Sequence, residues 1–254
     1  MPTDVDISLS VVSHGQTALV QELLYDISRH CGDERIELIL TLNLQDEVTP
    51  DLSCCIFPVQ LLRNRHPLGF GANHNQAFVR ARGAYFCVLN PDIRLDVNPF
   101  RALVQALDTP NVGVAAPLVL GVDGTQEDSA RRFPTPLAIV RRLLTGKHDA
   151  VYLARDVDSQ PDWVGGMFML LPRAVYRQAN GFDERYFLYY EDVDLCGRLR
   201  LLGWNAMVCS SARVTHNAQR SSHKKLRYLR WHLGSVLRFF TSKTFVSLWR
   251  KGCL

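Results

Sequence analysis

The sequence predicts an α/β fold with a mostly parallel central sheet and helices on both faces. Short apolar runs alternate along the chain with segments of helical apolar spacing, and turn residues separate them. The chain has 254 residues, 47% of them hydrophobic and 21% charged, which suits a globular protein with a sizeable core. In such sheets ligands bind outside the carboxyl ends of the strands, so those ends are where a site is expected.

The first strand is expected at residues 7–12, an apolar run without charge, and a turn then leads into a helix that ends near Gly32. The same patterns continue as far as residue 89. It predicts strands at 36–42, 56–62 and 85–89 and a helix at 72–82. Polar residues stand at the expected carboxyl ends of these strands: Ser13, Asn43, Arg63 with Asn64, and Asn90 to Asp92.

The second half is less regular. A helix is expected at 98–107, a strand at 112–117 and a further strand at 163–171, whereas 125–161 reads as a long polar loop. A loop of this length in a compact domain is usually functional or mobile.

Cysteine usage indicates a reducing compartment, because the seven cysteines are odd in number and form no C-x-x-C pair. Neither a signal-peptide pattern nor a run of 18 apolar residues is present, so a cytoplasmic protein is expected. Charge is divided unevenly: residues 195–254 carry 12 basic and no acidic residues, and residues 1–194 carry 17 basic and 25 acidic ones. This division suggests that the C-terminal end meets a polyanion or an anionic membrane surface.

Residues 181–200 hold an unusual cluster of acids. Glu191, Asp192 and Asp194 follow an aromatic run and open a helical pattern that ends at Gly203. Carboxylates in a first helical turn are stabilised by the helix dipole, so we expect them to be ionised near neutral pH. An ionised carboxylate beside aromatic side chains can accept a proton from a hydroxyl. The alternative is that these acids only cap the helix.

Asp92 ends the strand at 85–89, and Pro91 restricts the backbone directly before it. A hard oxygen ligand at this edge suits Mg²⁺ or Mn²⁺ carrying phosphate oxygens. The alternative is an ordinary turn aspartate. His216 either completes this metal site or is a hydrogen-bonded core histidine.

Two further stretches are of a kind that can contact a nucleotide or a sugar. Gly69 and Gly71 open the helix after a polar segment, which allows close approach of a sugar or phosphate. Trp163 precedes Gly165 and Gly166 and is either a stacking platform for a sugar or a core residue. The glycines do not form the dinucleotide fingerprint G-x-G-x-x-G, which disfavours an oxidoreductase. A nucleic-acid-binding module would explain the basic tail but would leave the acids without a purpose.

Taken in order, these motifs resemble one known arrangement over nearly the whole chain. They are an initial V-V-S-H-G turn, N-x-x-x-x-G-F-G-x-x-x-N, a strand ending in N-P-D, W-V-G-G-x-F-M-L, the acidic stretch G-F-D-E-x-Y-F-x-Y-x-E-D-x-D-L-x-x-R, and a distal His. The arrangement resembles the inverting glycosyltransferases of family 2. It is most similar to the rhamnosyltransferases that build bacterial O-antigen and cell-wall linkers, through the S-A-R-R-F-P segment and the tail.

This resemblance implies a GT-A fold, Rossmann-like, with a C-terminal basic helical extension. It implies a glycosyltransferase domain at 1–217, with a donor-binding half at about 1–120 and an acceptor and catalytic half at about 121–217, followed by a basic amphipathic tail at 218–254. The tail would lie on the anionic inner leaflet, which places the enzyme peripherally on the cytoplasmic membrane, or it packs on the domain with a solvated basic face. No nucleic-acid partner is expected.

The resemblance also assigns roles to residues. Asp192 corresponds to the general base that deprotonates the acceptor hydroxyl, and Asp92 and His216 correspond to ligands of a divalent metal, Mg²⁺ or Mn²⁺. Asp194 and Arg198 correspond to supporting positions. The acceptor side takes Trp163, Gly165, Gly166 and Glu191. The donor site takes Ser13, His14, Asn43, Asn64, Gly69, Gly71, Asn75, Asn90 and Arg132, with Arg131 as an alternative diphosphate clamp.

The chain departs from the family pattern at two positions. Asn90 stands where many relatives have Asp, so metal binding is expected to be weaker or to rely more on the diphosphate. Leu42 stands where an Asp usually reads the pyrimidine base, which leaves the base preference open. The resemblance implies dTDP-rhamnose as donor and a polyprenyl-diphosphate-linked saccharide as acceptor. A UDP-sugar donor, or a non-catalytic relative that binds nucleotide sugars, remains an alternative.

Overall fold

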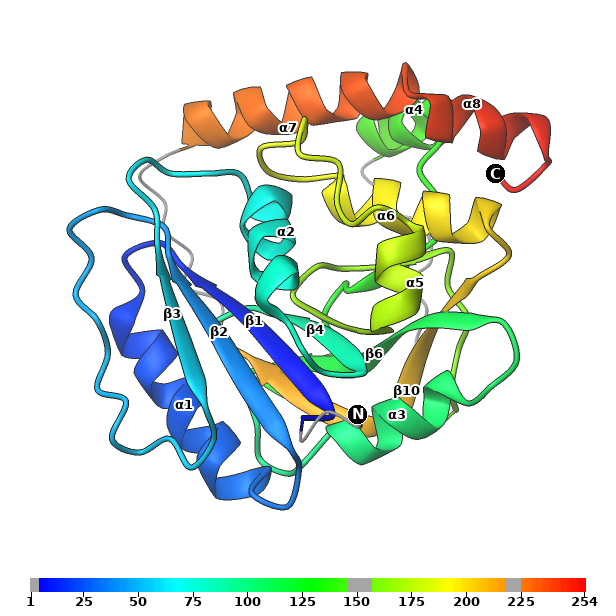
Figure 1. Cartoon of the computed structure of the whole chain (residues 1–254). Helices are drawn as coiled ribbons and strands as arrows, with labels where there is room; N and C mark the ends of the chain where they lie inside the picture. The colour runs from blue at the N-terminus through cyan, green and yellow to red at the C-terminus, as the bar shows by residue number, and fades with distance from the viewer. Residues whose placement is uncertain (1–4, 146–156, 218–224) are drawn as a thin grey trace.

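The computed structural model describes residues 5–145, 157–217 and 225–254, and Figure 1 shows a central sheet between two layers of helices. The eight strands of this sheet run in the order β3-β2-β1-β4-β9-β6-β10-β5. They are β1 (Ile7–Ser13), β2 (Ile36–Leu42), β3 (Val59–Arg63), β4 (Tyr85–Leu89), β5 (Ile93–Arg94), β6 (Val112–Gly121), β9 (Phe168–Pro172) and β10 (Asn205–His216). A separate two-stranded sheet pairs β7 (Ala130–Arg131) with β8 (Trp163–Val164).

The sheet is mostly parallel, as the sequence predicts. Strands β3, β2, β1 and β4 are parallel neighbours, and β6 is parallel to β10. Strand β9 lies between β4 and β6 and is antiparallel to both, and β5 is antiparallel to β10. The carboxyl ends of the parallel strands therefore meet at one edge, where ligand sites of open α/β sheets are found.

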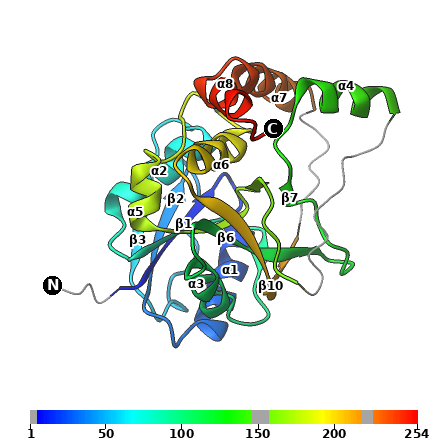
Figure 2. The same ribbon diagram turned by 90° about the vertical axis from the view of Figure 1, so that its right-hand side faces the viewer.

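Helices cover both faces of the sheet (Figures 1 and 2). On one face, Leu23 and Ile27 of α1 and Phe100 of α3 pack into one buried cluster with the strands. On the other face, Ala77 of α2 and Tyr176 of α5 belong to a second cluster, which α6 completes. The helices are α1 (Thr17–His30), α2 (Phe70–Arg80), α3 (Phe100–Leu107), α4 (Pro136–Thr145), α5 (Arg173–Gln178), α6 (Glu191–Leu201), α7 (Lys225–Phe240) and α8 (Lys243–Arg250).

Three expectations about elements need correction. The strand expected at 163–171 is two strands in different sheets, because the chain turns at Gly166 and Met167 between β8 and β9. The stretch 125–161 is not only loop, since it contains β7 and α4, while 146–156 lies outside the described residues. The tail forms two helices, because the hydroxyl of Ser242 accepts a hydrogen bond from the Phe245 N–H (3.0 Å) and begins a new helix.

The two C-terminal helices are packed on α6 and on the loop before it. Phe239 of α7 and Leu248 of α8 are fully buried in the second cluster. Gly197 of α6 allows this approach, because a side chain there would meet Thr244 and Leu248 of α8 at 2.8 and 3.1 Å. No helix within the described ranges has the length and apolar character needed to cross a membrane.

Candidate active site

A cavity of about 910 Å³ opens at the carboxyl ends of β1, β2 and β4. Ligand pockets typically measure about 300–1,000 Å³, so this one is at the upper end of the range. Residues from the whole length of the chain line it. Those that the sequence predicts are His14, Asn43, Asn90, Asp92, Trp163, Gly165, Gly166, Glu191 and Asp192, and Arg131 is present as well.

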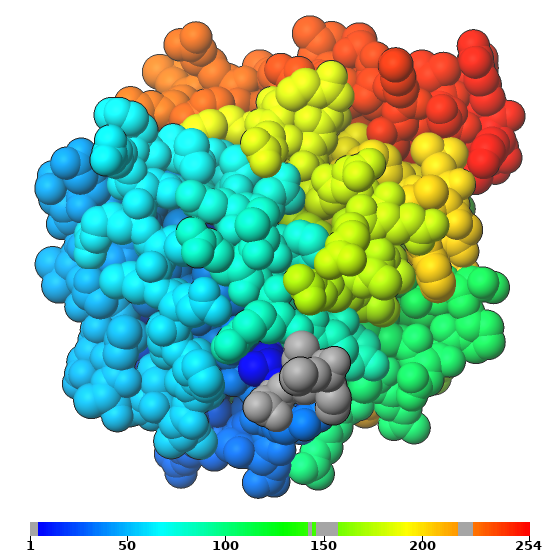
Figure 3. All heavy atoms as spheres, in the orientation of Figure 1, coloured from blue at the N-terminus to red at the C-terminus, as the bar shows by residue number. Residues whose placement is uncertain are grey.

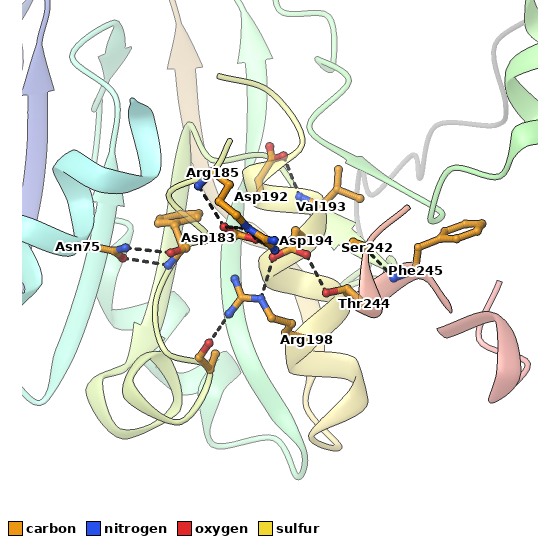
Figure 4. Close-up of polar contacts among 12 residues, drawn as sticks. Asn75, Asp183, Arg185, Asp192, Val193, Asp194, Arg198, Ser242, Thr244 and Phe245 are labelled. Carbon is orange, nitrogen blue, oxygen red and sulfur yellow. Dashed lines mark hydrogen bonds and ion pairs between the residues drawn. The ribbon is translucent and has the colours of Figure 1, made fainter. Parts of the chain in front are cut away.

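Asp192 is held in place by two backbone groups. Its Oδ2 accepts a hydrogen bond from the Gly166 N–H (3.0 Å), and its Oδ1 accepts one from the N–H of Val193 (2.8 Å; Figure 4). Burial raises the pKa of Asp192, and these two hydrogen bonds work in the opposite direction by stabilising the ionised form. The glycine turn between β8 and β9 thus orients the carboxylate into the cavity.

Glu191, the adjacent acid, differs from Asp192 in its hydrogen bonding. It is only 5% exposed, and its Oε2 has no hydrogen-bond partner among the residues that the structure describes. Burial raises the pKa of Glu191 well above its usual value, and the charge of Asp192 raises it further. This shift opposes the expectation that the first helical turn keeps both acids ionised, because desolvation of Glu191 favours its neutral form. Beside an ionised carboxylate that accepts a proton, a neutral carboxyl group can donate a hydrogen bond.

The backbone before these acids is strained. Tyr189 and Tyr190 have φ angles of 71° and 68°, in the left-handed region that residues other than glycine rarely adopt. Each such residue costs about 1–3 kcal/mol, and such strain clusters at functional sites. The N–H of Asp194 donates to the Tyr190 carbonyl (2.9 Å) and so fixes the start of α6 directly after this turn.

Asp194 and Arg198, which the resemblance assigns to supporting positions, are not among the residues that line the cavity. The two side chains form an ion pair (2.7 Å), and Asp194 also accepts a hydrogen bond from the Thr244 hydroxyl of α8 (2.8 Å; Figure 4). Arg198 in turn donates to the carbonyl oxygen of Ala179. This network ties α6 both to α8 and to the end of α5.

Replacing Asp194 by Ala should lower the free energy of unfolding by about 3–5 kcal/mol, because it leaves Arg198 without its buried partner. Thr244→Val is the matched control. It removes one neutral hydroxyl from the same network, so it should cost only about 1 kcal/mol. Equilibrium unfolding in urea measures both values. Equal small losses for the two variants would contradict the view that Asp194 anchors the two helices.

Asp92 and His216 come together through the sheet. His216 pairs with Ile93 in the β5–β10 register, which places its Nε2 3.2 Å from Asp92 Oδ2. The other ring nitrogen lies 2.7 Å from Glu127 Oε2. The hydrogen bond with Asp92 is the main cause that raises the pKa of His216 to about 9. A residue 124 positions away in the sequence thus becomes the direct neighbour of Asp92, as the resemblance implies.

These residues fit a divalent cation in part. Oδ1 of Asp92 is buried and, within the described chain, has no hydrogen-bond partner, and the Asn90 amide lines the same cavity. Glu127 on the far nitrogen of His216 is the outer partner that a metal-binding histidine usually has. Among the described residues, however, no three His, Cys, Asp or Glu side chains group as a metal site. Hard oxygens from a bound diphosphate would have to complete the coordination.

An amide network forms the wall on the side of β2. Asn43 Oδ1 accepts hydrogen bonds from the side chain of Asn64 (2.8 Å) and from the N–H of Leu68 (2.9 Å). Asn64 also donates to the side chain of Asn73 (2.6 Å). Ser13 is fully buried behind this wall, where its hydroxyl donates to Glu47. Asn43 thus reaches the cavity, whereas Asn64 and Ser13 hold the wall from behind.

Asn75, Gly69 and Gly71 were predicted to line the donor site, but they contact other parts of the chain and do not line the cavity. Asn75 accepts hydrogen bonds from the Tyr176 hydroxyl (2.7 Å) and the Phe182 N–H (2.9 Å), and Asn73 takes its expected place in the cavity wall. A side chain at Gly69 would meet the backbone of Phe187 at 2.8 Å, and one at Gly71 would meet Phe182 at 2.5 Å. The close approach that these glycines allow is between α2 and the loop before α6.

The fold decides which of two neighbouring arginines, Arg131 or Arg132, lines the cavity. Arg131 lies on β7 and lines the cavity, where it pairs with Asp128. Arg132 is exposed, and its carbonyl oxygen accepts a hydrogen bond from the Trp163 indole N–H (2.9 Å). Neighbouring residues of a strand point to opposite sides, so the sequence alone does not identify which one faces the cavity.

Sequence reasoning missed one whole wall of the cavity. Arg227, Tyr228, Trp231 and His232 of α7 line it beside Phe187 and Tyr189. The available signal was their common helical face, since residues at spacings of three and four lie together. The tail was predicted to be a separate extension, so its contact with the cavity that Glu191 and Asp192 line was not predicted.

Sequence comparisons find a matching family model and related proteins. The sequence model described as "Glycosyltransferase like family 2" matches residues 5–234. Rhamnosyltransferase WbbL of Escherichia coli is 27% identical over 250 residues, covering 93% of this chain and 93% of that protein. An N-acetylglucosaminyl-diphospho-decaprenol L-rhamnosyltransferase of Mycobacterium tuberculosis is 29% identical over 209 residues, covering 74% of this chain and 68% of that protein.

Solved structures share the fold. The structure of GalNAc-T7 with UDP, GalNAc and Mn²⁺ aligns with a TM-score of 0.64 at 15% identity, over 85% of this chain and 44% of that one. The mannosyltransferase PcManGT of Pyrobaculum calidifontis, in complex with GDP-Man and Mn²⁺, aligns with a TM-score of 0.59 at 15% identity, over 94% of this chain and 68% of that one.

Proposed function

This chain belongs to the glycosyltransferase like family 2, and from that premise we propose that it transfers L-rhamnose from dTDP-rhamnose, with inversion, to a lipid-linked saccharide. It is a glycosyltransferase, and its fold is the GT-A fold of the solved structures that it resembles. The names of two relatives support rhamnose, and one of these relatives is named for a decaprenol-linked acceptor. The pathway would be synthesis of a bacterial surface polysaccharide, such as O-antigen lipopolysaccharide or a cell-wall linker.

The observation that carries the proposal is the pair of adjacent carboxyl groups in one cavity with Asp92. The acceptor hydroxyl attacks the anomeric carbon, a new C–O bond forms on the opposite face, and the bond to the nucleotide diphosphate breaks. Asp192, oriented by Gly166, takes the hydroxyl proton. Burial raises the pKa of Glu191 and so favours its neutral form, in which the carboxyl group can donate a hydrogen bond to the acceptor.

The donor diphosphate belongs on the side of Asp92 and Arg131. Asp92, Asn90 and His216 would hold Mg²⁺ or Mn²⁺, which supplies positive charge to the departing diphosphate. Arg131 provides a planar cation in the same cavity, suited to phosphate oxygens. Asn43 and His14 extend the wall towards the expected nucleoside side.

Thermal stabilisation tests the donor assignment. We would measure the melting temperature with dTDP, UDP and GDP and with dTDP-rhamnose, each with and without Mn²⁺ or Mg²⁺, because binding to the folded state raises it by mass action. The largest, metal-dependent stabilisation is expected from the thymidine ligands. Stabilisation by UDP alone would replace the donor by a UDP-sugar. Binding without turnover in a transfer assay would indicate a non-catalytic nucleotide-sugar-binding protein.

We propose further that the tail rests on an anionic membrane surface. Helices α4, α7 and α8 lie on the same side of the molecule (Figures 1 and 2), and Figure 3 shows α7 and α8 along its edge. Leu226 and Leu237 of α7 are 79% and 67% exposed, and Trp249 of α8 is 70% exposed. Arg230 and Arg250 are exposed on the same two helices. Apolar side chains among basic ones suit the interface of an anionic bilayer.

Vesicle flotation tests this association. The protein should float with vesicles that contain anionic lipid and less with neutral ones. The double variant Leu229→Glu/Leu233→Glu should weaken flotation, because both leucines are exposed on α7. Val79→Glu, at a valine of α2 that is even more exposed than the two leucines, is the control and should float as the wild type does. Absence of binding to either vesicle type would refute the membrane assignment.

A further inference from the structure

Helix α7 presents two different faces. Arg227, Tyr228 and Trp231 line the active-site cavity on one face, and Ser235 continues this face with a hydrogen bond to the Leu188 carbonyl (2.9 Å). Leucines recur at helical spacing on the opposite face, and all of them are exposed: Leu226, Leu229, Leu233 and Leu237. One helix thus connects the interior of the active site with an apolar outer surface.

The cavity face of α7 forms an aromatic cluster with the loop before the catalytic acids. The Trp231 ring lies 4.6 Å from that of Phe187 at an interplanar angle of 32°, and the Tyr228 ring meets Trp231 edge-on at 5.4 Å. The His232 ring meets Tyr189 edge-on at 5.4 Å. Aromatic rings with a polar edge are suited to the apolar face and hydroxyls of a sugar ring. Tyr189 is two residues from Glu191, so this platform lies on the acceptor side of the site.

Arg227 adds a cation to this platform. Its side chain is exposed at the cavity, and no hydrogen bond or ion pair joins it to another residue in the described part of the chain. Arg131, in contrast, already has Asp128 as a partner in the same cavity. An arginine without a carboxylate partner at the rim of a site is available for phosphate oxygens, which it binds in a bidentate manner.

We propose that α7 is the acceptor-recognition helix, on which Tyr228 and Trp231 receive the acceptor sugar, Arg227 binds the diphosphate next to it, and the outer leucines meet the lipid chain. The order of these three features along the helix surface matches an amphiphile that consists of sugar, diphosphate and hydrocarbon. The inference rests on the proposed transfer to a lipid-linked saccharide. It assigns the recognition of that acceptor to a helix outside the family's catalytic motifs.

Direct binding measures this role without turnover. The probes are a short polyprenyl-diphosphate-linked N-acetylglucosamine and octyl N-acetylglucosaminide, which has the sugar and an alkyl chain but no diphosphate, each titrated in detergent without donor. Arg227→Ala should weaken binding of the diphosphate probe at least about tenfold, as loss of a charge-assisted hydrogen bond does, and leave the octyl glycoside unchanged. Arg230→Ala is the matched control, because this exposed arginine of the same helix is not part of the cavity wall.

Variants of Trp231 test the proposed contact between the aromatic cluster and the acceptor sugar. Trp231→Ala should weaken binding of both probes, and Trp231→Phe, which keeps a ring against Phe187, should restore most of it. Equal affinity of wild type and Arg227→Ala for the diphosphate probe would overturn the proposal. An equal loss of affinity in Arg227→Ala and Arg230→Ala would also overturn it, because it would indicate unspecific charge attraction. Donor-sugar hydrolysis without acceptor is measured in parallel. If the wild type does not hydrolyse the donor, this would count against the proposed function. The binding measurements test the role of α7 independently of that result.

Discussion

Asp192→Asn should reduce sugar transfer by at least about 100-fold, because general bases typically contribute about 10²–10⁴ to the rate. The amide keeps the shape of the side chain, but it cannot take the proton of the acceptor hydroxyl. Stabilisation of the protein by donor nucleotide should persist, since the side chain of Asp192 accepts hydrogen bonds from the backbone N–H groups of Gly166 and Val193, and Asn replaces this side chain without a change of shape. Turnover with saturating donor and acceptor measures the first effect, and thermal shift with the nucleotide measures the second.

The pH profile gives the same prediction a second readout. The base acts only when deprotonated, so the rate should rise with pH through the pKa of Asp192. Burial raises this pKa, so the acidic limb should lie above the value of about 3.9 for an ordinary aspartate. In Asp192→Asn the residual activity should lose this limb.

The control for this series is Asp108→Asn, which removes one exposed carboxylate at the end of α3. It should leave both rate and pH profile unchanged. If Asp192→Asn kept its turnover but lost affinity for the donor nucleotide, Asp192 would be a donor-binding residue and another group would have to act as the base.

Asp92→Ala should abolish the metal-dependent part of donor binding. This variant removes the carboxylate whose buried Oδ1 has no partner in the described residues and which we propose as the metal ligand. A bound metal contributes several kcal/mol of charge stabilisation, and each 1.36 kcal/mol is a factor of ten, so turnover should fall at least about 100-fold. The measurement is the melting temperature with donor nucleotide, with and without Mn²⁺, together with the transfer rate.

Asn90→Asp is the complementary variant. It adds a second carboxylate two residues before Asp92, so the Mn²⁺ concentration needed for half-maximal stabilisation should decrease. Folding of Asp92→Ala is not expected to be at risk, because His216 keeps its contact with Glu127. A metal response in Asp92→Ala that equals that of the wild type would show that the cation is held elsewhere.

The regular part of the fold was accessible from local patterns. The strands at 36–42 and 85–89 are observed with the expected bounds, because a buried strand reads as a continuous apolar run that polar residues end. The cluster of acids at the start of α6 was equally readable, since helix starts favour acids and the leucine spacing that follows is helical. These local rules were enough to predict which stretches meet at the carboxyl edge of the sheet.

Local patterns do not specify which way a side chain faces or how much water reaches it. Asn73 lines the cavity and Asn75 does not, because Asn75 is hydrogen-bonded to Phe182. Arg131 lines it and Arg132 does not, because the pairing of β7 with β8 sets the orientation of Arg131. The raised pKa of Glu191 follows from burial by residues far apart in the sequence.

The sequence by itself determined the α/β class, the strands that end at the site and the cluster of acids that opens α6, since these depend on periodicity and composition within short windows. Only the tertiary structure decided that His216 meets Asp92, that Gly166 holds Asp192, and that α7 forms a wall of the cavity. Each of these contacts joins segments that are distant along the chain. They depend on the summed packing of the whole molecule, which no local window contains.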